Sequence, residues 1–108
     1  MTVNNILKPH SGFEILQTTL LSQSAVMDLA PGESSSKEPN SHPLSDQTVV
    51  VLQGMVSAEI DGKKLILHKG DSVTVPAGAR HRFVNISGEL VTTFNVYSPP
   101  AYSGSGVA

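Results

Sequence analysis

The sequence predicts an all-β domain, and three of its features carry that prediction. Apolar residues gather in short runs rich in Val, Ile, Thr and Phe, the residue types that favour strands. Turn-forming Gly, Pro, Asn, Asp and Ser residues end these runs at intervals of about eight to twelve residues, as in β-sandwiches, barrels and jelly rolls. No segment has the apolar period of an amphipathic helix, so less than about one tenth of the chain should be helical. A parallel sheet is excluded because nothing could form its crossover helices.

The first half of the chain contains two strands, a polar segment and a third strand. Residues 13–21 and 25–29 are the first two strands, and Ala30-Pro31-Gly32 ends the second. Residues 32–46 are polar and contain two prolines, so we expect a loop or an irregular sheet edge there. Residues 48–52 form a nearly continuous apolar run, which is typical of a strand covered on both faces.

The second half consists of hairpins that follow a sharp bend at Gly54. Asp61-Gly62 lies between two apolar runs and is a strong hairpin signal. The strands predicted in this half are residues 55–60, 64–68, 72–75, 81–86 and 90–97. Turns are expected at Lys69-Gly70-Asp71, Pro76-Ala77-Gly78 and Ser87-Gly88, and Ser98-Pro99-Pro100 ends the last strand. We therefore expect one domain over residues 1–108, with a barrel core over about 13–98 and a loose tail from about 103.

Composition excludes several classes of protein. The formal charge of −2, the pI near 6.0 and the seven scattered Lys and Arg residues provide no basic stripe for nucleic acid. The absence of cysteine excludes a disulfide framework, a thiolate metal site and a cysteine nucleophile. No segment approaches the run of about 18 apolar residues that a membrane span needs, and the opening lacks the apolar run of a signal peptide. We expect a cytoplasmic protein with no membrane partner.

The chain is also expected to form a homodimer. A domain this small leaves much of its surface in water, and the apolar strand over residues 13–21 is more than such a barrel buries alone. Pairing across a two-fold axis would cover the open edge of that strand.

One pattern of residues near the end of the chain suggests a functional site. It reads Gly70-x5-Pro76-x-Gly78-x2-His81-x3-Asn85. The chain turns at Gly70, runs as a strand to Pro76, turns again, and presents His81 at the start of the next strand. Because side chains alternate along a strand, His81, Phe83 and Asn85 share one face, and the charged Arg82 on the other face places them inside.

This pattern resembles the second conserved motif of the cupin superfamily and fills its fixed positions. The first cupin motif contains Gly, His-x-His, Glu and Gly, and the corresponding segment here reads Gly32…Asn40-x-His42-x4-Gln47-x6-Gly54. Asn replaces one His and Gln replaces the Glu. The stretches HPLSDQ and NVYSPPAY are also similar to small single-domain cupins described as mannose-6-phosphate-isomerase-like. The resemblance implies a cupin double-stranded β-helix, or jelly-roll, barrel.

Cupins typically hold a divalent transition metal with three His and one Glu inside the barrel. Carried over by position, the resemblance implies a ligand set of His42, Gln47 and His81, with Asn40 in the fourth place. Such a set could hold Mn, Fe, Ni, Zn or Cu, but it has no negative charge and should hold the metal weakly. No nucleotide or organic cofactor is indicated. The neighbouring Asp46 is expected to face outward unless a bulge intervenes.

Each of these residues also has a purely structural interpretation. His81 could be a barrel histidine bonded to backbone, His42 an exposed loop residue, and Asn40 a turn former. We expect His42, Gln47 and His81 to converge on one point, with the Gln47 strand running beside the His81 strand. Alternation should turn Gln47, Val49 and Val51 inward together. The apolar residues expected to form the core or the pocket wall are Met27, Val49, Val51, Phe83 and Phe94.

Three functions are compatible with the sequence. The first is a metal-dependent enzyme of the oxygenase, isomerase or cyclase type acting on a small organic molecule. The second is a non-catalytic module that binds a sugar or metabolite at a degenerate metal site. The third is a structural or partner-binding cupin with a vestigial pocket, against which the complete second motif argues.

Overall fold

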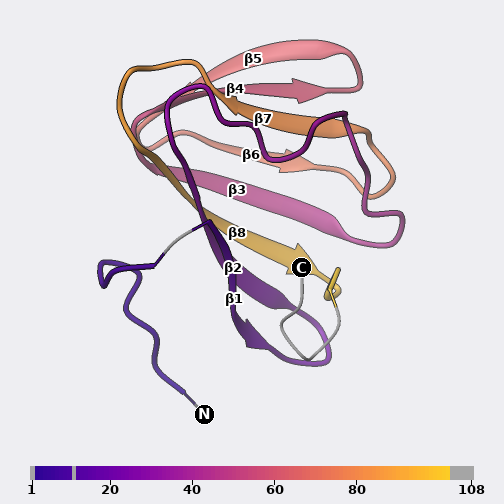
Figure 1. Cartoon of the computed structure of the whole chain (residues 1–108). Helices are drawn as coiled ribbons and strands as arrows, with labels where there is room; N and C mark the ends of the chain where they lie inside the picture. Colours follow the sequence, from indigo (N-terminus) through magenta and orange to yellow (C-terminus); the bar gives the residue numbers. More distant parts are fainter. Residues whose placement is uncertain (1, 11, 103–108) are drawn as a thin grey trace.

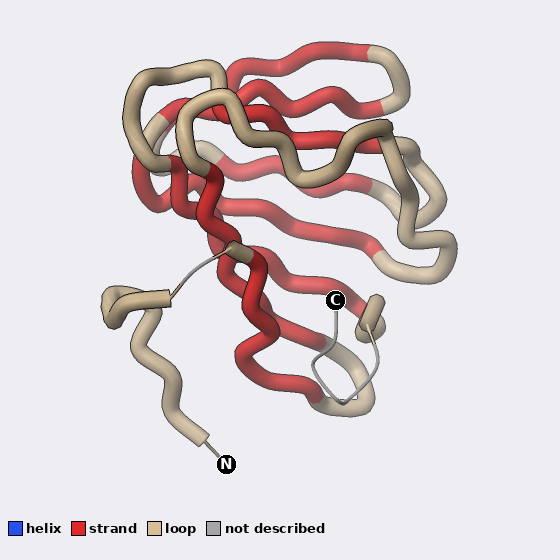
Figure 2. The backbone as a smooth tube through the Cα atoms, in the orientation of Figure 1, coloured by secondary structure: helices blue, strands red, loops and turns tan. Residues whose placement is uncertain are grey.

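The computed structural model describes residues 2–10 and 12–102, and within this part of the chain all regular secondary structure is β-strand (Figures 1 and 2). This confirms the all-β prediction. None of the described segments is a helix that could cross a membrane. The loose tail predicted from residue 103 lies outside the described residues. The strands are β1 (Phe13–Thr18), β2 (Gln23–Leu29), β3 (Asp46–Gln53), β4 (Met55–Ile60), β5 (Lys63–His68), β6 (Ser72–Val75), β7 (His81–Asn85) and β8 (Val91–Ser98).

The strands form two antiparallel sheets that face each other. One sheet has the order β1-β2-β8-β3-β6 and the other β5-β4-β7. Figure 1 shows the smaller sheet across from the larger one, with the β1–β2 hairpin extending the larger sheet at one edge. The chain therefore changes sheet four times: between β3 and β4, between β5 and β6, between β6 and β7, and between β7 and β8. The result is the two-layered jelly-roll barrel that the sequence predicts.

The change of sheet after β3 depends on Gly54. Its φ is +85°, a conformation that residues with a side chain rarely adopt. A Cβ atom built on Gly54 would lie 2.7 Å from the carbonyl oxygen of Leu90 and 2.9 Å from a methyl carbon of Val91. The bend and the close approach of β8 both require glycine here.

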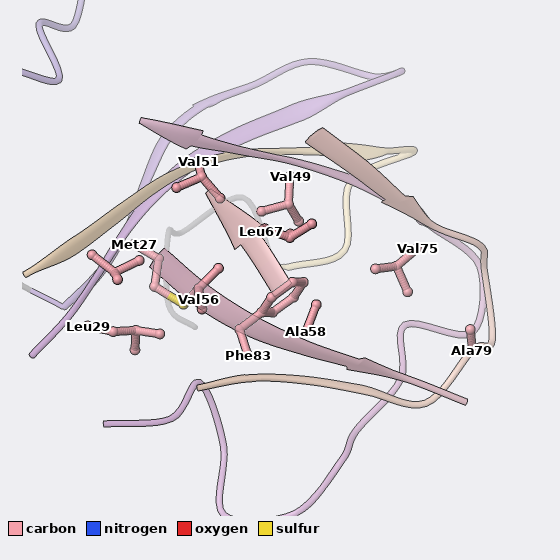
Figure 3. Packing of buried hydrophobic residues seen from close by; sticks show 11 residues of the cluster. Met27, Leu29, Val49, Val51, Val56, Ala58, Leu67, Val75, Ala79 and Phe83 are labelled. Atoms are coloured by element: carbon pink, nitrogen blue, oxygen red, sulfur yellow. The ribbon is translucent and has the colours of Figure 1, made fainter. Parts of the chain in front are cut away.

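The core lies between the two sheets (Figure 3). Side chains alternate so regularly that on β3 Gln47, Val49 and Val51 are buried while their neighbours are partly exposed. The inward direction predicted for these three residues is thus confirmed. The members of the apolar cluster are Met27, Leu29, Val49, Val51, Val56, Ala58, Leu67, Val75, Ala79, Phe83 and Val91. Full burial of each larger member is worth about 1.5–3 kcal/mol.

The polar segment after β2 is an irregular sheet edge, one of the two forms expected for it. It runs antiparallel to β7, with bridges between Ser34 and Val84 and between Asn40 and His81. Asn85 at the end of β7 is fully buried and structural. Its amide nitrogen donates to the carbonyls of Leu29 and Glu89, and its oxygen accepts hydrogen bonds from Ser87.

Two details differ from the sequence prediction. The first strand ends at Thr18, because residues 19–22 form a turn in which the amide of Thr19 donates to the carbonyl of Ser22. The prediction that the Gln47 strand runs beside the His81 strand is also wrong. β3 pairs with β6 and β8, whereas β7 pairs with β4. Alternation gives the face of a residue but does not give the partner of its strand.

Candidate functional site

A pocket of about 250 Å³ opens at one end of the barrel, at the start of β3 and the end of β8. Its lining comes from both sheets, the segment before β3 and the segment after β8. The lining residues are Phe13, Met27, Ser35, Asn40, His42, Gln47, His81, Phe83, Tyr97 and Tyr102. A wider hollow of about 550 Å³ lies at the β4–β5 turn, but its charged groups already pair with one another or with backbone.

His81 provides a buried imidazole with one free nitrogen. Its side chain opens β7, and the residue is only 4% exposed. Nδ1 lies 3.2 Å from the carbonyl oxygen of Ala79; since a carbonyl only accepts, the proton is on Nδ1 and the lone pair is on Nε2. Burial lowers the pKa of His81. The ring is therefore neutral at pH 7 and can accept a hydrogen bond or bind a cation.

His42 lies beside His81 although 39 positions separate them in the chain. Their ring centroids are 5.2 Å apart. Backbone hydrogen bonds hold the two segments together: Gly78 N–H donates to His42 O at 2.9 Å, and Asn40 and His81 exchange bonds of 3.0 and 2.7 Å. Burial and the neighbouring His81 lower the pKa of His42, so this half-buried ring is neutral as well.

Gln47 lines the same pocket, and within the described chain its side chain has a buried acceptor without a partner. Its Nε2 donates to Asn95 Oδ1 at 3.1 Å, Asn95 Nδ2 donates to Thr93 Oγ1 at 3.0 Å, and that hydroxyl faces the carbonyl of Met27 at 3.5 Å. The Met27 carbonyl at the end of this series of hydrogen bonds can only accept, so the Thr93 hydroxyl donates to it and accepts from Asn95 Nδ2. This fixes the orientation of the Asn95 amide and, through it, that of the Gln47 amide. Among the described residues, Gln47 Oε1 is left buried with no hydrogen-bond partner. An unsatisfied buried acceptor of this kind costs about 1–3 kcal/mol.

Asn40, the fourth residue of the predicted ligand set, and Asp46, the neighbour of Gln47, lie differently from the other three predicted ligands. Asn40 lines the pocket but is an exposed residue, and its backbone makes the bridge to His81. Asp46 faces outward, as expected for a regular strand, and its Oδ1 accepts a hydrogen bond from Ala77 N–H at 2.9 Å. Within the described chain, no three His, Cys, Asp or Glu side chains are grouped to hold a metal.

The donors available to a cation are thus the imidazoles of His42 and His81 and the amide oxygen of Gln47. They match a borderline divalent metal in kind, because imidazole and carbonyl oxygen are among its usual ligands. They supply no negative charge. Such an ion, or the hydrogen-bond donor of an organic ligand, would give the unpartnered Gln47 oxygen a partner.

The apolar residues expected at the pocket wall fall into three groups. Met27 and Phe83 line the pocket, whereas Val49 and Val51 belong to the core cluster beneath it. The placement of Phe94 in the pocket is corrected. On β8 the inward positions are Val91, Thr93, Asn95 and Tyr97, so alternation turns Phe94 to the outer face of the sheet.

Three aromatic residues missed or left unassigned by the sequence analysis complete the pocket together with Phe83 and the histidines. Tyr97 and Tyr102 lie with their ring centroids 5.2 and 5.4 Å from His42, and Phe13 packs 5.0 Å from Tyr102. Burial raises the pKa of both tyrosines, so their hydroxyls stay protonated. Tyr97 alternates with the polar Asn95 on β8, but Thr92 and Thr93 place hydroxyl groups on both faces of that strand, so alternation was no clear signal for this wall. Phe13 and Tyr102 gave none.

Comparisons with known proteins agree with this architecture. A family model for the cupin domain matches residues 25–97. Two Streptomyces proteins are similar in sequence. Polyketide synthase CurC of Streptomyces cyaneus is 34% identical over 66% of this chain and 47% of its own length. Tetracenomycin polyketide synthase protein TcmJ of Streptomyces glaucescens is 32% identical over 55% of this chain and 38% of its own length. The chain thus spans less than half the length of these relatives. The crystal structure of BH2720 from Bacillus halodurans has a TM-score of 0.87, with 21% identity over 98% of this chain and 86% of that one.

Proposed function

This chain belongs to the cupin family, and from that premise we propose that its barrel pocket binds a small, uncharged organic molecule that carries a hydroxyl or another hydrogen-bond donor. The site residues in this proposal are His42, Gln47 and His81 as polar contacts, with Tyr97 and Phe83 as walls. Cupin domains are built around such a barrel site, and a pocket that is mostly apolar with a few convergent polar groups is the usual form of a small-molecule site.

The observation that carries the proposal is the unpartnered oxygen of Gln47. Gln47 lines the same pocket as two neutral imidazoles, each of which has a lone pair to offer. A ligand donor that reaches Gln47 Oε1 would remove the cost of leaving a buried acceptor unsatisfied. Anionic ligands are disfavoured, because every described residue that lines the pocket is uncharged when the histidines are neutral. A sugar phosphate would find no cationic partner there.

The similarity to proteins named for polyketide synthases is in line with this ligand class. Polyketides are carbon skeletons that carry ketone, enol and phenol groups, and they offer neutral hydroxyl donors on flat, apolar frames. A neutral imidazole at His42 or His81 could also take a proton from a bound enol, which is the step that begins many isomerisations and cyclisations. The runner-up is binding without turnover of a sugar or another metabolite.

A weakly held divalent metal is the second candidate, and the same three side chains support it. His42, His81 and the Gln47 oxygen would hold the ion, which when bound would act as a Lewis acid on a carbonyl or enol oxygen. This chain's own residues would then orient the ligand against the aromatic wall. Metal analysis of protein purified without chelator and without a histidine tag tests this candidate directly.

The binding proposal is tested by titrating the protein with a panel of neutral phenols and hydroxyketones, each matched to the corresponding carboxylate. Amide shifts in NMR spectra locate the site, and calorimetry gives the affinity. Neutral members should bind and shift residues around His42 and Gln47, while the carboxylates should not. Gln47→Met removes the acceptor at similar volume and should weaken binding by about tenfold, the value of one lost hydrogen bond of about 1.4 kcal/mol.

Thr48→Val is the matched control. Thr48 is the next residue of β3, but its hydroxyl faces the other side of the sheet, where it bonds Thr74 at 3.0 Å. Binding should therefore be unchanged in this variant. Preferential binding of the carboxylates, or equal effects of the two substitutions, would show that the proposal misidentifies the ligand contact.

A further inference from the structure

The four residues that follow β8 fold back over the pocket. We call residues 99–102 the strap; the end of the described chain turns beside the β1–β2 hairpin in Figure 1. Tyr102 lies at its end and belongs to the pocket lining. Its ring packs against three others, with centroid distances of 5.0 Å to Phe13, 5.2 Å to Tyr97 and 5.4 Å to His42. The strap therefore supplies one wall of the pocket without being part of either sheet.

A single buried side chain fixes the backbone of the strap. Gln23, at the start of β2, is 1% exposed and uses both ends of its amide. Its Oε1 accepts hydrogen bonds from the N–H groups of Ala101 at 3.2 Å and Tyr102 at 3.0 Å. Its Nε2 donates to the carbonyl of Tyr102 at 3.2 Å and to Thr18 Oγ1 at 3.0 Å. Three of these four bonds hold the strap, so Gln23 acts as its latch.

The size of the pocket indicates what the strap does. With Tyr102 in place, the cavity measures about 250 Å³, which is below the range of about 300–1,000 Å³ usual for ligand sites. The other walls are strands held by sheet hydrogen bonds along their length, and the segment before β3, whose backbone is hydrogen-bonded to β7 and to Gly78. Within the described chain the strap is held by Gln23, by the packing of the Tyr102 ring and by a side-chain hydrogen bond between Tyr102 and Tyr97. It has no sheet hydrogen bonds within that part of the chain, so it is the wall that can give way for a larger ligand.

We propose that the strap is a lid on the barrel pocket, that Tyr102 is the residue that limits ligand size, and that Gln23 is the positioning residue that holds the lid closed. The lid itself is a property of the chain alone, whereas the size limit rests on the binding function proposed above. Opening the lid exposes Tyr102 and enlarges the pocket while the two sheets stay intact.

Lid closure is tested without any ligand. The chain has no tryptophan and two tyrosines, so in a Tyr97→Phe protein all intrinsic fluorescence near 300 nm comes from Tyr102. We expect acrylamide to quench this fluorescence several times less than that of free tyrosine amide, and the amides of Ala101 and Tyr102 to exchange slowly in NMR spectra. Adding Gln23→Glu replaces the donor that faces the Tyr102 carbonyl by an acceptor. Quenching and exchange at residues 101 and 102 should then rise toward free values, with β8 amides still protected.

Gln17→Glu is the matched control, since Gln17 lies on the neighbouring strand but bonds Thr2 and Asn4 at the exposed surface. It should leave the strap closed. The lid would be overturned by fast exchange of the Ala101 and Tyr102 amides in the unmodified protein together with free quenching of Tyr102 in the Tyr97→Phe protein. Equal effects of the two Gln→Glu substitutions would overturn it as well. If Gln23→Glu fails to fold, Gln23→Asn provides the same test. The amide protons of residues 101 and 102 should exchange slowly in the unmodified protein and fast in this variant.

The size limit is tested with phenol and with the three-ring 9-phenanthrol. In Tyr102→Ala, 9-phenanthrol should bind at least about tenfold more tightly than to the parent protein, while the affinity for phenol changes by less than about twofold. A parallel change for both compounds, or none for either, would overturn Tyr102 as the size-limiting residue. If neither compound binds any variant while the quenching results hold, the proposed binding function fails and the lid stands.

Discussion

Replacing Gln47 by Glu exchanges one buried NH₂ group for an oxygen and leaves the shape of the side chain unchanged. In the native protein that NH₂ donates to Asn95 Oδ1 at 3.1 Å, and Asn95 cannot turn its own amide because Thr93 fixes it. At pH 8, where the imidazoles are neutral, the carboxylate would face a second acceptor at this distance. Losing the bond and leaving a buried acceptor unpaired costs about 1–3 kcal/mol.

We expect Gln47→Glu to lower the free energy of unfolding at pH 8 by about 2 kcal/mol, which for a domain of this size is a fall in melting temperature of about 8–16 °C. Zinc should reverse the loss, since the carboxylate adds the negative charge that His42 and His81 lack as ligands. Zinc at about 100 times its Kd would restore about 2.7 kcal/mol. Urea unfolding monitored by circular dichroism, with and without zinc, measures both effects.

The control is Gln53→Glu, at the exposed end of the same strand, which should change stability by less than about 0.5 kcal/mol and show no zinc effect. Unaltered stability of Gln47→Glu at pH 8 would mean that Gln47 does not donate to Asn95. The orientation assigned to its amide would then have no basis. An equal zinc effect in the Gln47 and Gln53 variants would remove position 47 from any metal site.

Three further predictions follow from other parts of the molecule. The free energy of unfolding should fall between pH 7.5 and pH 5, because burial lowers the pKa of His42 and His81 and the unfolded chain then binds more protons. The pKa of His10 is raised by the Lys8 carbonyl and Asp28, so His10 adds stability as the pH falls toward about 6.5 and offsets part of this fall. Urea titrations should find a steeper fall in His10→Gln and a shallower one in His42→Phe. Gly32→Ala should lower the free energy of unfolding by about 1–2 kcal/mol, the cost of a left-handed conformation, because its φ is +81° and a Cβ there meets open space. Gly54→Ala should lower it by more, because its Cβ meets the Leu90 carbonyl at 2.7 Å. Equal costs of the two substitutions in thermal melts would contradict the close approach. Sedimentation at micromolar concentration should find a homodimer rather than an 11.4 kDa monomer, because β1 is an open edge of the larger sheet.

Much of the fold and part of the site follow from the sequence by simple alternation. The inward faces of β3 and β7 were predicted correctly because each carries a residue that settles its orientation: Arg82 on β7, and the polar Gln47 in register with two valines on β3. Such information is local. It depends on the period of two along a strand and needs no knowledge of its partners.

The features that could not be predicted have physical reasons as well. β8 has apolar or β-branched residues on both faces, so nothing in it indicated that Phe94 faces out while Asn95 faces in. Strand partners depend on where the chain changes sheet, which two neighbouring turns do not reveal. Tyr102 follows a Pro-Pro pair in a segment without any period, and its position is set by Gln23, 79 residues away in the chain.

The uncharged lining of the pocket has a consequence for how a ligand would arrive. Long-range attraction raises the encounter rate of a charged ligand, and that advantage is lost as the ionic strength rises. Here none of the described lining residues bears a charge once both imidazoles are neutral, and the net charge of the chain is only −2. A neutral ligand would meet this protein by unsteered diffusion, at a rate that is the same in dilute buffer and in the salt of a cell.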